Sequence, residues 1–273
     1  MNLKSVFILG GNGFVGSAYE RYYRNLNYKV TVIGREDYSN YIGSECDILI
    51  NANGNSKKFL GLSDPKKEFR ESVLSVRESL IDFKYKKYVY LSTSDIYPDC
   101  SSPELTHESL EISPATQSVY GFHKYLAELC VQQSASDWLI VRQGGFVGKG
   151  LKKNAIYDVL FGQKLWVHPE SRFQFINTDT SARLVSDLIA KGLSNEILNL
   201  TALGTISVNE ILNLIDRKVA YDGNELPKHY EISTEKASKI LELPETRQTI
   251  LDFIESLSDK SDVVNIGSKQ TPT

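Results

Sequence analysis

The sequence predicts an α/β fold, a doubly wound parallel sheet with helices on both faces and a smaller C-terminal part. Short segments rich in β-branched and aliphatic residues alternate with amphipathic helical stretches over most of the 273 residues, which is the pattern of βαβ units. This length suits one large domain, or one with a modest addition. Hydrophobic residues make up 41% of the chain and charged residues 24%, as in ordinary globular proteins.

The elements follow from local pattern. Apolar runs predict strands at residues 6–9, 30–33, 47–51, 88–92, 139–142, 173–176 and 197–200. Apolar residues recurring every three to four positions predict helices at 14–26, 65–83, 117–133, 153–162, 180–192 and 207–215, with shorter ones at 234–241 and 247–257. Only thirteen residues separate the second and third strands, close to the minimum for a parallel crossover. We therefore expect one strand-helix unit to be abbreviated there.

Charge and cysteine content argue against several classes of function. Lys and Arg number 31 against 34 Asp and Glu, a formal charge of -3, so no global basic field is present to hold nucleic acid. Cys46, Cys100 and Cys130 are widely spaced, and the four histidines show no metal-ligand spacing, which argues against a disulfide framework or a metal site. Apolar runs fall short of the about 18 residues of a membrane span. We expect a cytoplasmic protein with neither membrane nor nucleic acid as a partner.

A glycine-rich turn follows the first strand. Gly10, Gly13 and Gly16 stand three residues apart where the strand SVFIL passes into a helix. The first glycine allows a sharp turn, the second a close approach to a pyrophosphate, and the third tight packing of helix on strand. The helix N-terminus then favours the phosphate charge. The turn predicts a Rossmann-type dinucleotide site, although a plain tight turn is the alternative, and its candidate cofactor-binding residues are Gly10, Asn12, Gly13, Phe14, Val15 and Gly16.

The end of the second strand bears on the choice of cofactor. Gly34-Arg35 stands where NAD-selective enzymes tend to have an acidic residue, and no carboxylate occupies that strand end. An arginine there can pair with a 2′-phosphate, so Arg35 favours NADP over NAD. The alternative is a solvated arginine neutralised by the neighbouring Glu36 and Asp37, which would leave NAD as the cofactor.

Two further motifs carry candidate chemistry. Tyr120 and Lys124 are four residues apart on a predicted helix and therefore project from one face. An adjacent ammonium and an oxidised nicotinamide would both favour the phenolate form of a tyrosine. Thr93, Ser94 and Asp95 follow a predicted strand, at the sheet edge where open α/β folds bind ligands. Taken singly, the first pair is common on exposed helices and the second is a turn or cap sequence.

The ordered motifs resemble the extended short-chain dehydrogenase/reductases, the NAD-dependent epimerase/dehydratase family that acts on nucleotide sugars. GGNGFVG is similar to the family's G-x-x-G-x-x-G, YLSTSDIY to its Ser/Thr-bearing strand end, and YGFHK to its Tyr-x-x-x-Lys. Weaker similarities extend to about residue 255, in INANG, SDPKKEF, VRQGGFVGKG, FQFINTD and EILNLTALGTISVNEI. The resemblance implies a Rossmann-type part at residues 1–145, a mixed substrate-binding part at 146–257 interleaved with the last sheet strands, and, from composition, a mobile tail at 258–273.

By this resemblance Tyr120 is the general acid/base, and Lys124 holds the nicotinamide ribose and lowers the pKa of the tyrosine. Thr93 assists at the substrate oxygen; it is preferred to its serine neighbours because it lies four residues before Tyr97, the offset that the family keeps. Asp95 stands where related dehydratases and decarboxylases have an acidic residue. It is either a second proton carrier or a cap of the following loop.

The resemblance also implies binding residues outside these motifs. Asn53 and Gly54 of INANG are implied for the cofactor, and Ser94, Asn154 and Arg172 for the substrate. The chain departs from the family pattern at Ser72, where an asparagine is usual, and at Arg172, which is displaced from the position of the family's arginine.

The leading functional hypothesis is an NADPH-using reductase of a nucleotide-linked keto sugar. The alternatives are an epimerase, dehydratase or decarboxylase with tightly held NAD, in which Asp95 would handle a second proton, and a non-catalytic dinucleotide-binding sensor or scaffold. The family usually forms homodimers through a four-helix interface. Ala127, Cys130 and Val131 on the helix of Tyr120 could serve there, or pack equally well inside one subunit.

Overall fold

The computed structural model describes residues 4–54, 57–221 and 223–258. Within them lies a parallel sheet of six strands in the order β2-β1-β3-β4-β5-β9. Its strands are β1 (Ser5–Leu9), β2 (Lys29–Ile33), β3 (Glu45–Asn51), β4 (Lys84–Thr93), β5 (Trp138–Gln143) and β9 (Glu196–Leu200). The chain moves from β1 outward to β2 and then returns to pair β3 on the other side of β1. The topological switch, where such sheets bind ligands at the carboxyl ends of the strands, therefore lies at β1.

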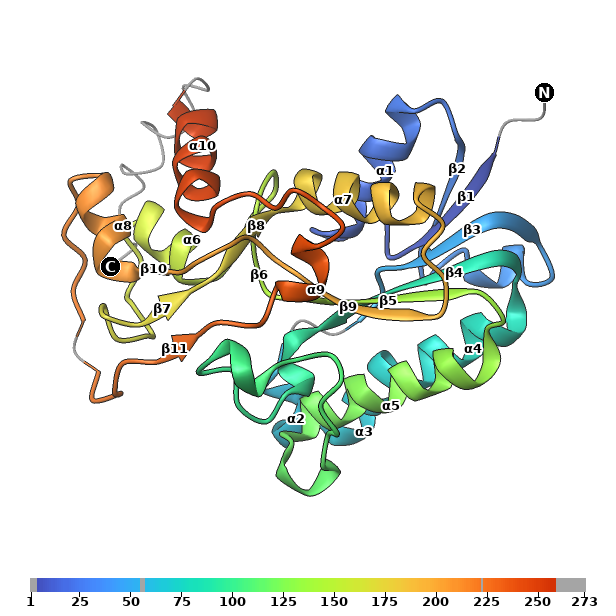
Figure 1. The fold of residues 1–273 in the computed structure, drawn as a ribbon, viewed down its shortest axis with the longest axis horizontal. Coiled ribbons are helices and arrows are strands. Elements are labelled where there is room, and N and C mark those ends of the chain that lie inside the picture. The colour runs from blue at the N-terminus through green and yellow to red at the C-terminus, as the bar shows by residue number, and fades with distance from the viewer. Residues whose placement is uncertain (1–3, 55–56, 222, 259–273) are drawn as a thin grey trace, which may run out of the picture.

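Helices cover both faces of the sheet (Figure 1). One face carries α1 (Gly16–Asn25) and α7 (Thr178–Ala190), and the other carries α3 (Pro65–Phe69), α4 (Ser75–Asp82) and α5 (Val119–Ser134). Strand β1 shows why: Val6 and Ile8 join the apolar cluster of the first face, and Phe7 and Leu9 join that of the second. A strand buried on both faces needs apolar residues at every position, which explains its continuous hydrophobic run.

The connection between β2 and β3 is short, as expected. It contains the single 3-10 turn Tyr38–Tyr41, and β2 forms the edge of the sheet. The abbreviated strand-helix unit that the sequence predicts is confirmed.

The strands and helices of the C-terminal part lie together at one end of the molecule (Figure 1). Their apolar side chains form a separate cluster. The strands of this part are β6 (Gly145–Val147) paired with β8 (Phe175–Asn177), and β10 (Ile206–Ser207), β7 (Arg172–Phe173) and β11 (His229–Tyr230) in a three-stranded sheet. Its helices are α6 (Ala155–Leu160), α8 (Val208–Leu214) and α10 (Thr246–Ser258). Two short helices pack elsewhere: α2 (Leu60–Ser63) contacts α3 and α5, and α9 (Glu235–Ser238) contacts β9. The expected tail, 258–273, lies outside the described residues apart from the residue that ends α10.

The structure corrects one expectation and decides between two alternatives. The single strand predicted at 173–176 is wrong, because the chain leaves one sheet and joins another at Gln174, whose buried side chain accepts from Ile232 N at 2.7 Å. Of the two alternatives for the α5 residues, a dimer face or packing inside one subunit, the structure shows the second. Ala127 and Val131 are fully buried against the sheet of their own subunit, and Cys130 packs beside them.

Candidate functional site

The glycine turn has the geometry that its spacing predicts. Gly10 has φ +74°, and a Cβ on Gly16 would lie 2.3 Å from the Gly10 carbonyl oxygen. A side chain at either position would therefore break the turn or push α1 off β1. Helix α1 begins at Gly16 with the apolar Val15 at its N-cap and no acidic residue in its first turn. Ser17 N and Ala18 N donate to carbonyl oxygens of the preceding turn, but the positive end of the helix dipole still favours a phosphate here.

The end of β2 holds a carboxylate that the sequence analysis missed. Asp37 folds back, and its Oδ1 accepts from Gly34 N at 2.7 Å. Arg35 is 79% exposed and pairs loosely with Glu71 at 3.6 Å. Both an acidic and a basic group thus stand at the position that selects between a ribose hydroxyl and a 2′-phosphate. The expectation that no carboxylate is available there is wrong, because a three-residue turn returns the side chain of Asp37 to the strand end.

The segment after β3 connects the glycine turn to Lys124. A Cβ on Gly10 would lie 2.8 Å from Asn53 Oδ1, and a Cβ on Gly54 would lie 3.3 Å from Lys124 Nζ. Gly54 itself has φ +157°. The two glycines therefore let the β3 end pass closely between the turn and the ammonium group. Asn53, Gly54 and Lys124, predicted separately from sequence, meet at the carboxyl edge of the sheet.

Helix α5 sets its first turn directly against the end of β4. Ser118 caps the helix by accepting from Gly121 N at 3.0 Å. A Cβ on Gly121 would lie only 2.2 Å from the Asp95 carbonyl oxygen, so this glycine permits the close approach. Tyr120 is 8% exposed and Lys124 is 3% exposed. Both side chains of the predicted pair therefore lie inside the molecule, beside the strand end that carries Thr93 and Asp95.

The electrostatics of the pair differ from the sequence-based expectation. Burial lowers the pKa of Lys124 to about 8, against the opposing charges of Glu128, Glu68 and Asp95. Burial also raises the pKa of Tyr120 well above its ordinary 10, and the charges of Asp95 and Glu68 act in the same direction. The expected lowering is therefore wrong for the protein's own groups, because loss of solvent and the charges of two carboxylates raise this pKa. Tyr120 is a protonated phenol at neutral pH.

Asp95 contacts several side chains at the end of β4. Its Oδ1 accepts from Lys58 Nζ at 2.6 Å, and its Oδ2 accepts from Thr93 Oγ1 at 3.0 Å. Thr93 also caps the following 3-10 turn, Ser94–Ile96, by accepting from Asp95 N at 3.2 Å. Sequence reasoning missed Lys58, whose partner is 37 residues away, and a lysine following a strand end offers no signal by itself.

Tyr230 reaches this cluster from the C-terminal part. Its hydroxyl lies 2.7 Å from Ser94 Oγ and donates to Asp95 Oδ1 at 3.4 Å. Burial is the main cause of its raised pKa, with the charge of Asp95 next. Sequence reasoning missed this tyrosine also, since strand β11 has two residues and too short a pattern to detect.

The two other predicted substrate residues make contacts elsewhere. Asn154 caps α6 by accepting from Tyr157 N at 2.9 Å and donates to Phe146 O at 2.8 Å. Arg172 donates to Glu210 Oε1 at 2.8 Å and to Thr205 Oγ1 at 3.0 Å. Their assignment to the substrate stays a prediction.

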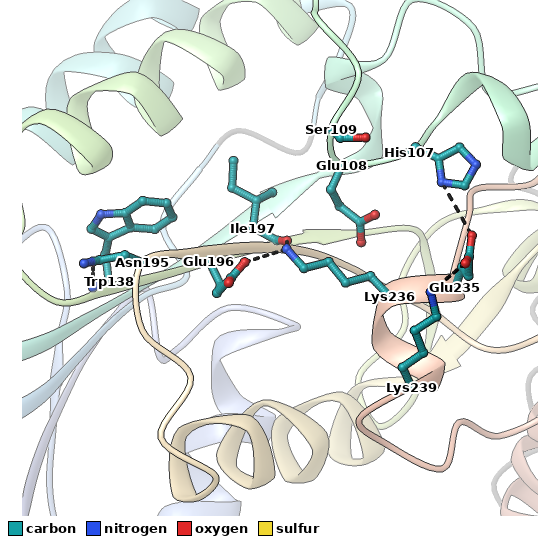
Figure 2. Close-up of a pocket in the computed structure, with 10 residues that line it drawn as sticks. All are labelled: His107, Glu108, Ser109, Trp138, Asn195, Glu196, Ile197, Glu235, Lys236 and Lys239. Atoms are coloured by element: carbon teal, nitrogen blue, oxygen red, sulfur yellow. Dashed lines mark hydrogen bonds and ion pairs between the residues drawn. The ribbon is translucent and has the colours of Figure 1, made fainter.

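A cavity of about 520 Å³ lies away from this site, along the outer edge of β9 (Figure 2). It is bordered by Trp138 and Asn195, near the amino ends of β5 and β9. Its charged groups pair with one another: Lys236 Nζ lies 2.6 Å from Glu196, and Glu235 lies 2.7 Å from Lys239. The residues that line the cavity do not include Tyr120, Lys124, Thr93 or Asp95. In the described part of the chain no group of three or more His, Cys, Asp or Glu side chains could hold a metal ion, and no helix there is long and apolar enough to cross a membrane.

Solved structures share this fold over almost their whole length. The dTDP-4-dehydrorhamnose reductase of Bacillus anthracis, in complex with NADP, has a TM-score of 0.76 at 16% identity, over 94% of this chain and 99% of its own. A UDP-galactose 4-epimerase gives 0.77 at 19% identity over 94% and 99%. The UDP-glucuronic acid 4-epimerase of Bacillus cereus, with NAD, gives 0.74 at 16% over 93% and 99%.

Identities this low establish the fold alone. Among curated proteins no sequence matches this chain. The model of the NAD dependent epimerase/dehydratase family matches residues 6–200, which include the glycine turn, the end of β4 and the Tyr120–Lys124 helix. The chain therefore belongs to the NAD dependent epimerase/dehydratase family.

Proposed function

We propose that this protein is an NADPH-dependent reductase of a keto group on a nucleotide-linked sugar, with Tyr120 as proton donor. The observation that carries the proposal is the seating of Tyr120 and Lys124 between the ends of β3 and β4. There the ammonium of Lys124 lies against Gly54, and the backbone beside Tyr120 touches Asp95. Membership of a family of NAD(P)-dependent enzymes supports the same assignment.

The residues present fit a nicotinamide dinucleotide. Gly13 is exposed on the glycine turn, next to a helix N-terminus without acidic residues in its first turn, which suits a diphosphate. Arg35, largely exposed, would hold a 2′-phosphate, and Lys124 would hold the nicotinamide ribose. NADPH, when bound, supplies the hydride.

The chain's own groups manage the proton. Tyr120, protonated because burial and two carboxylates raise its pKa, donates its phenolic proton to the keto oxygen as negative charge develops there. Lys124, one helical turn further on, stabilises the phenolate that remains. General acid catalysis of this kind contributes about 10²–10⁴-fold to a rate.

Two measurements test the proposal. Titration of NADPH against NADH should show tighter binding of NADPH, and a panel of nucleotide-linked keto sugars should contain one that oxidises NADPH. Tyr120→Phe should then reduce turnover on that substrate by about 10²–10⁴-fold while leaving NADPH affinity within about twofold. Full turnover by Tyr120→Phe would contradict the catalytic assignment and favour a non-catalytic dinucleotide-binding protein.

One observation supports a second candidate, an epimerase, dehydratase or decarboxylase. Asp95 lies among Lys58, Thr93 and Tyr230 at the same strand end, where a carboxylate could move a second proton. Purified protein that carries NAD and turns over without added cofactor would favour this candidate and reject the reductase.

The oligomeric state is a separate expectation. We expect a homodimer formed through exposed apolar residues of the two long helices, such as Ile81 on α4 and Leu129 on α5, which are 65% and 42% exposed. Sedimentation of the wild type and of Ile81→Asp tests this, and a monomeric wild type would contradict it.

A further inference from the structure

A fully buried carboxylate contacts α5 at His123, the residue that precedes Lys124. Glu68 on α3 is 0% exposed; one of its oxygens accepts from the hydroxyl of Ser72, and the other contacts Nδ1 of His123. Because a carboxylate only accepts hydrogen bonds, this contact requires the Nδ1–H tautomer of the imidazole. Burying a carboxylate costs free energy unless the carboxylate is well paired. We therefore ask which function the buried Glu68 serves.

The local backbone brings the three side chains together. The helix that contains Glu68 passes into a π-turn at Arg70–Leu74, and such turns are frequent at functional sites. Ser72 lies within this turn and faces the same partner as Glu68. His123 follows Tyr120 by three residues and immediately precedes Lys124 on α5, so the carboxylate reaches the catalytic turn of that helix.

Several groups face Lys124 from the elements packed around it. The ring of Tyr90 on β4 has its centroid 4.6 Å from the ammonium. Three carboxylates oppose the effect of burial on the pKa of Lys124: Glu128 from α5, Glu68 from α3 and Asp95 from the turn after β4. Such charges favour the protonated form of a buried lysine.

These carboxylates differ in how their charge is already balanced. Glu128 is bound by Arg142 at 2.7 Å, and Asp95 by Lys58 at 2.6 Å, so a basic side chain offsets each. In the described part of the chain Glu68 instead contacts a hydroxyl and an imidazole, and its charge acts on the ammonium of Lys124.

We propose that Glu68, held in place by Ser72 and His123, is a positioning residue that keeps Lys124 in its ammonium form at neutral pH. This inference rests on the proposed function, because it gives Lys124 its role in holding the nicotinamide ribose. The carboxylate acts through Lys124 and contacts no substrate.

The test measures NADPH binding as a function of pH, by the fluorescence of the dihydronicotinamide, and needs no substrate. Wild-type affinity should hold up to about pH 8, where Lys124 loses its proton, and weaken above it. We call the pH at which NADPH affinity begins to fall the break. Glu68→Gln should lower this break by about one pH unit, at the lower end of the range for a nearby opposite charge. Binding of NADPH at pH 7.5 should then be several-fold weaker than in the wild type. Glu68→Asp, which keeps the charge, should restore the break toward its wild-type pH.

Glu78→Gln is the matched control, since Glu78 lies exposed on the following helix α4 and its loss removes the same charge. It should leave the break unchanged. If Glu68→Gln fails to fold, the double variant Glu68→Gln, His123→Gln replaces the pair by two amides that can bond to each other, and carries the same prediction.

A folded Glu68→Gln protein whose melting temperature falls but whose break stays at the wild-type pH overturns the proposal and leaves Glu68 a purely structural residue. Failure of the proposed function looks different. In that case the wild type itself binds no NADPH, or Lys124→Ala does not change its affinity.

Discussion

Gly121→Ala should displace the turn of α5 that carries Tyr120 by adding a single methyl group. The new Cβ would lie 2.2 Å from the Asp95 carbonyl oxygen, whereas ordinary contacts begin at 3.4 Å. The carbonyl oxygen belongs to the backbone, and the new Cβ is attached directly to the backbone of α5. No flexible side chain can therefore move to relieve the contact. Helix α5 must therefore retreat by about 1 Å, and overpacking of this kind costs about 1–3 kcal/mol.

The same shift carries Tyr120 and Lys124 away from the strand ends. A misplacement of about 1 Å at a reacting group can reduce a rate by about 10²-fold. We expect urea unfolding to show the loss of stability, NADPH fluorescence titration to show weaker binding, and NADPH oxidation with the identified keto sugar to fall by about that factor.

Gly192→Ala is the control for the stability loss itself. Gly192 follows α7 with φ +78°, and a Cβ there meets nothing within 4 Å. An alanine in this left-handed conformation costs about 1–2 kcal/mol without touching the site, so stability should fall while NADPH affinity and turnover do not. Wild-type stability and activity in Gly121→Ala would refute the claim that this contact positions Tyr120 and Lys124.

Three further predictions concern the cofactor, the core and acid stability. Arg35→Ala should weaken NADPH binding by about 10-fold, the low end for a charge-assisted hydrogen bond, and change NADH binding little; equal losses in parallel titrations would reject the 2′-phosphate contact. Glu128→Gln should lower the free energy of unfolding in urea by about 3–5 kcal/mol, because it leaves the guanidinium of the fully buried Arg142 without its counter-charge; a loss below about 1 kcal/mol would contradict this. A hydrogen bond from Lys86, followed by one from the backbone, lowers the pKa of Asp47 to about 2. Because this pKa is depressed on folding, the stability it contributes is present above about pH 4 and lost as the pH falls toward 2; Asp47→Asn should flatten that part of the pH–stability curve, and an unchanged curve would disprove the contribution.

Much of the site was accessible to sequence reasoning because its motifs are local. The glycine turn depends on residues three apart, and Tyr120 and Lys124 share a face because a helix repeats every 3.6 residues. The strand end at Thr93 follows from a buried apolar run that stops at polar residues. The family model, which matches residues 6–200, agrees with the resemblance that these motifs carry.

The residues that sequence reasoning missed act across long separations. Lys58 pairs with a carboxylate 37 residues away, Glu68 with a ring 55 residues away, and Tyr230 with a carboxylate 135 residues away. Gly121 belongs to the YGFHK motif, yet its role depends on a contact with the backbone of Asp95, which lies in another element. The hydrophobic periodicity of the sequence cannot predict such pairings, because each forms only when α3, β4, α5 and β11 pack together.

The sequence by itself determined the strand-helix alternation, the glycine turn and the spacing of the phenol and the ammonium. Each of these depends on residues that are only a few positions apart in the sequence. Only the tertiary structure decided the protonation of that pair, the carboxylate at the end of β2 and the split of the strand at Gln174. Those properties depend on how far water is excluded and on which charges and amides from distant segments come into contact.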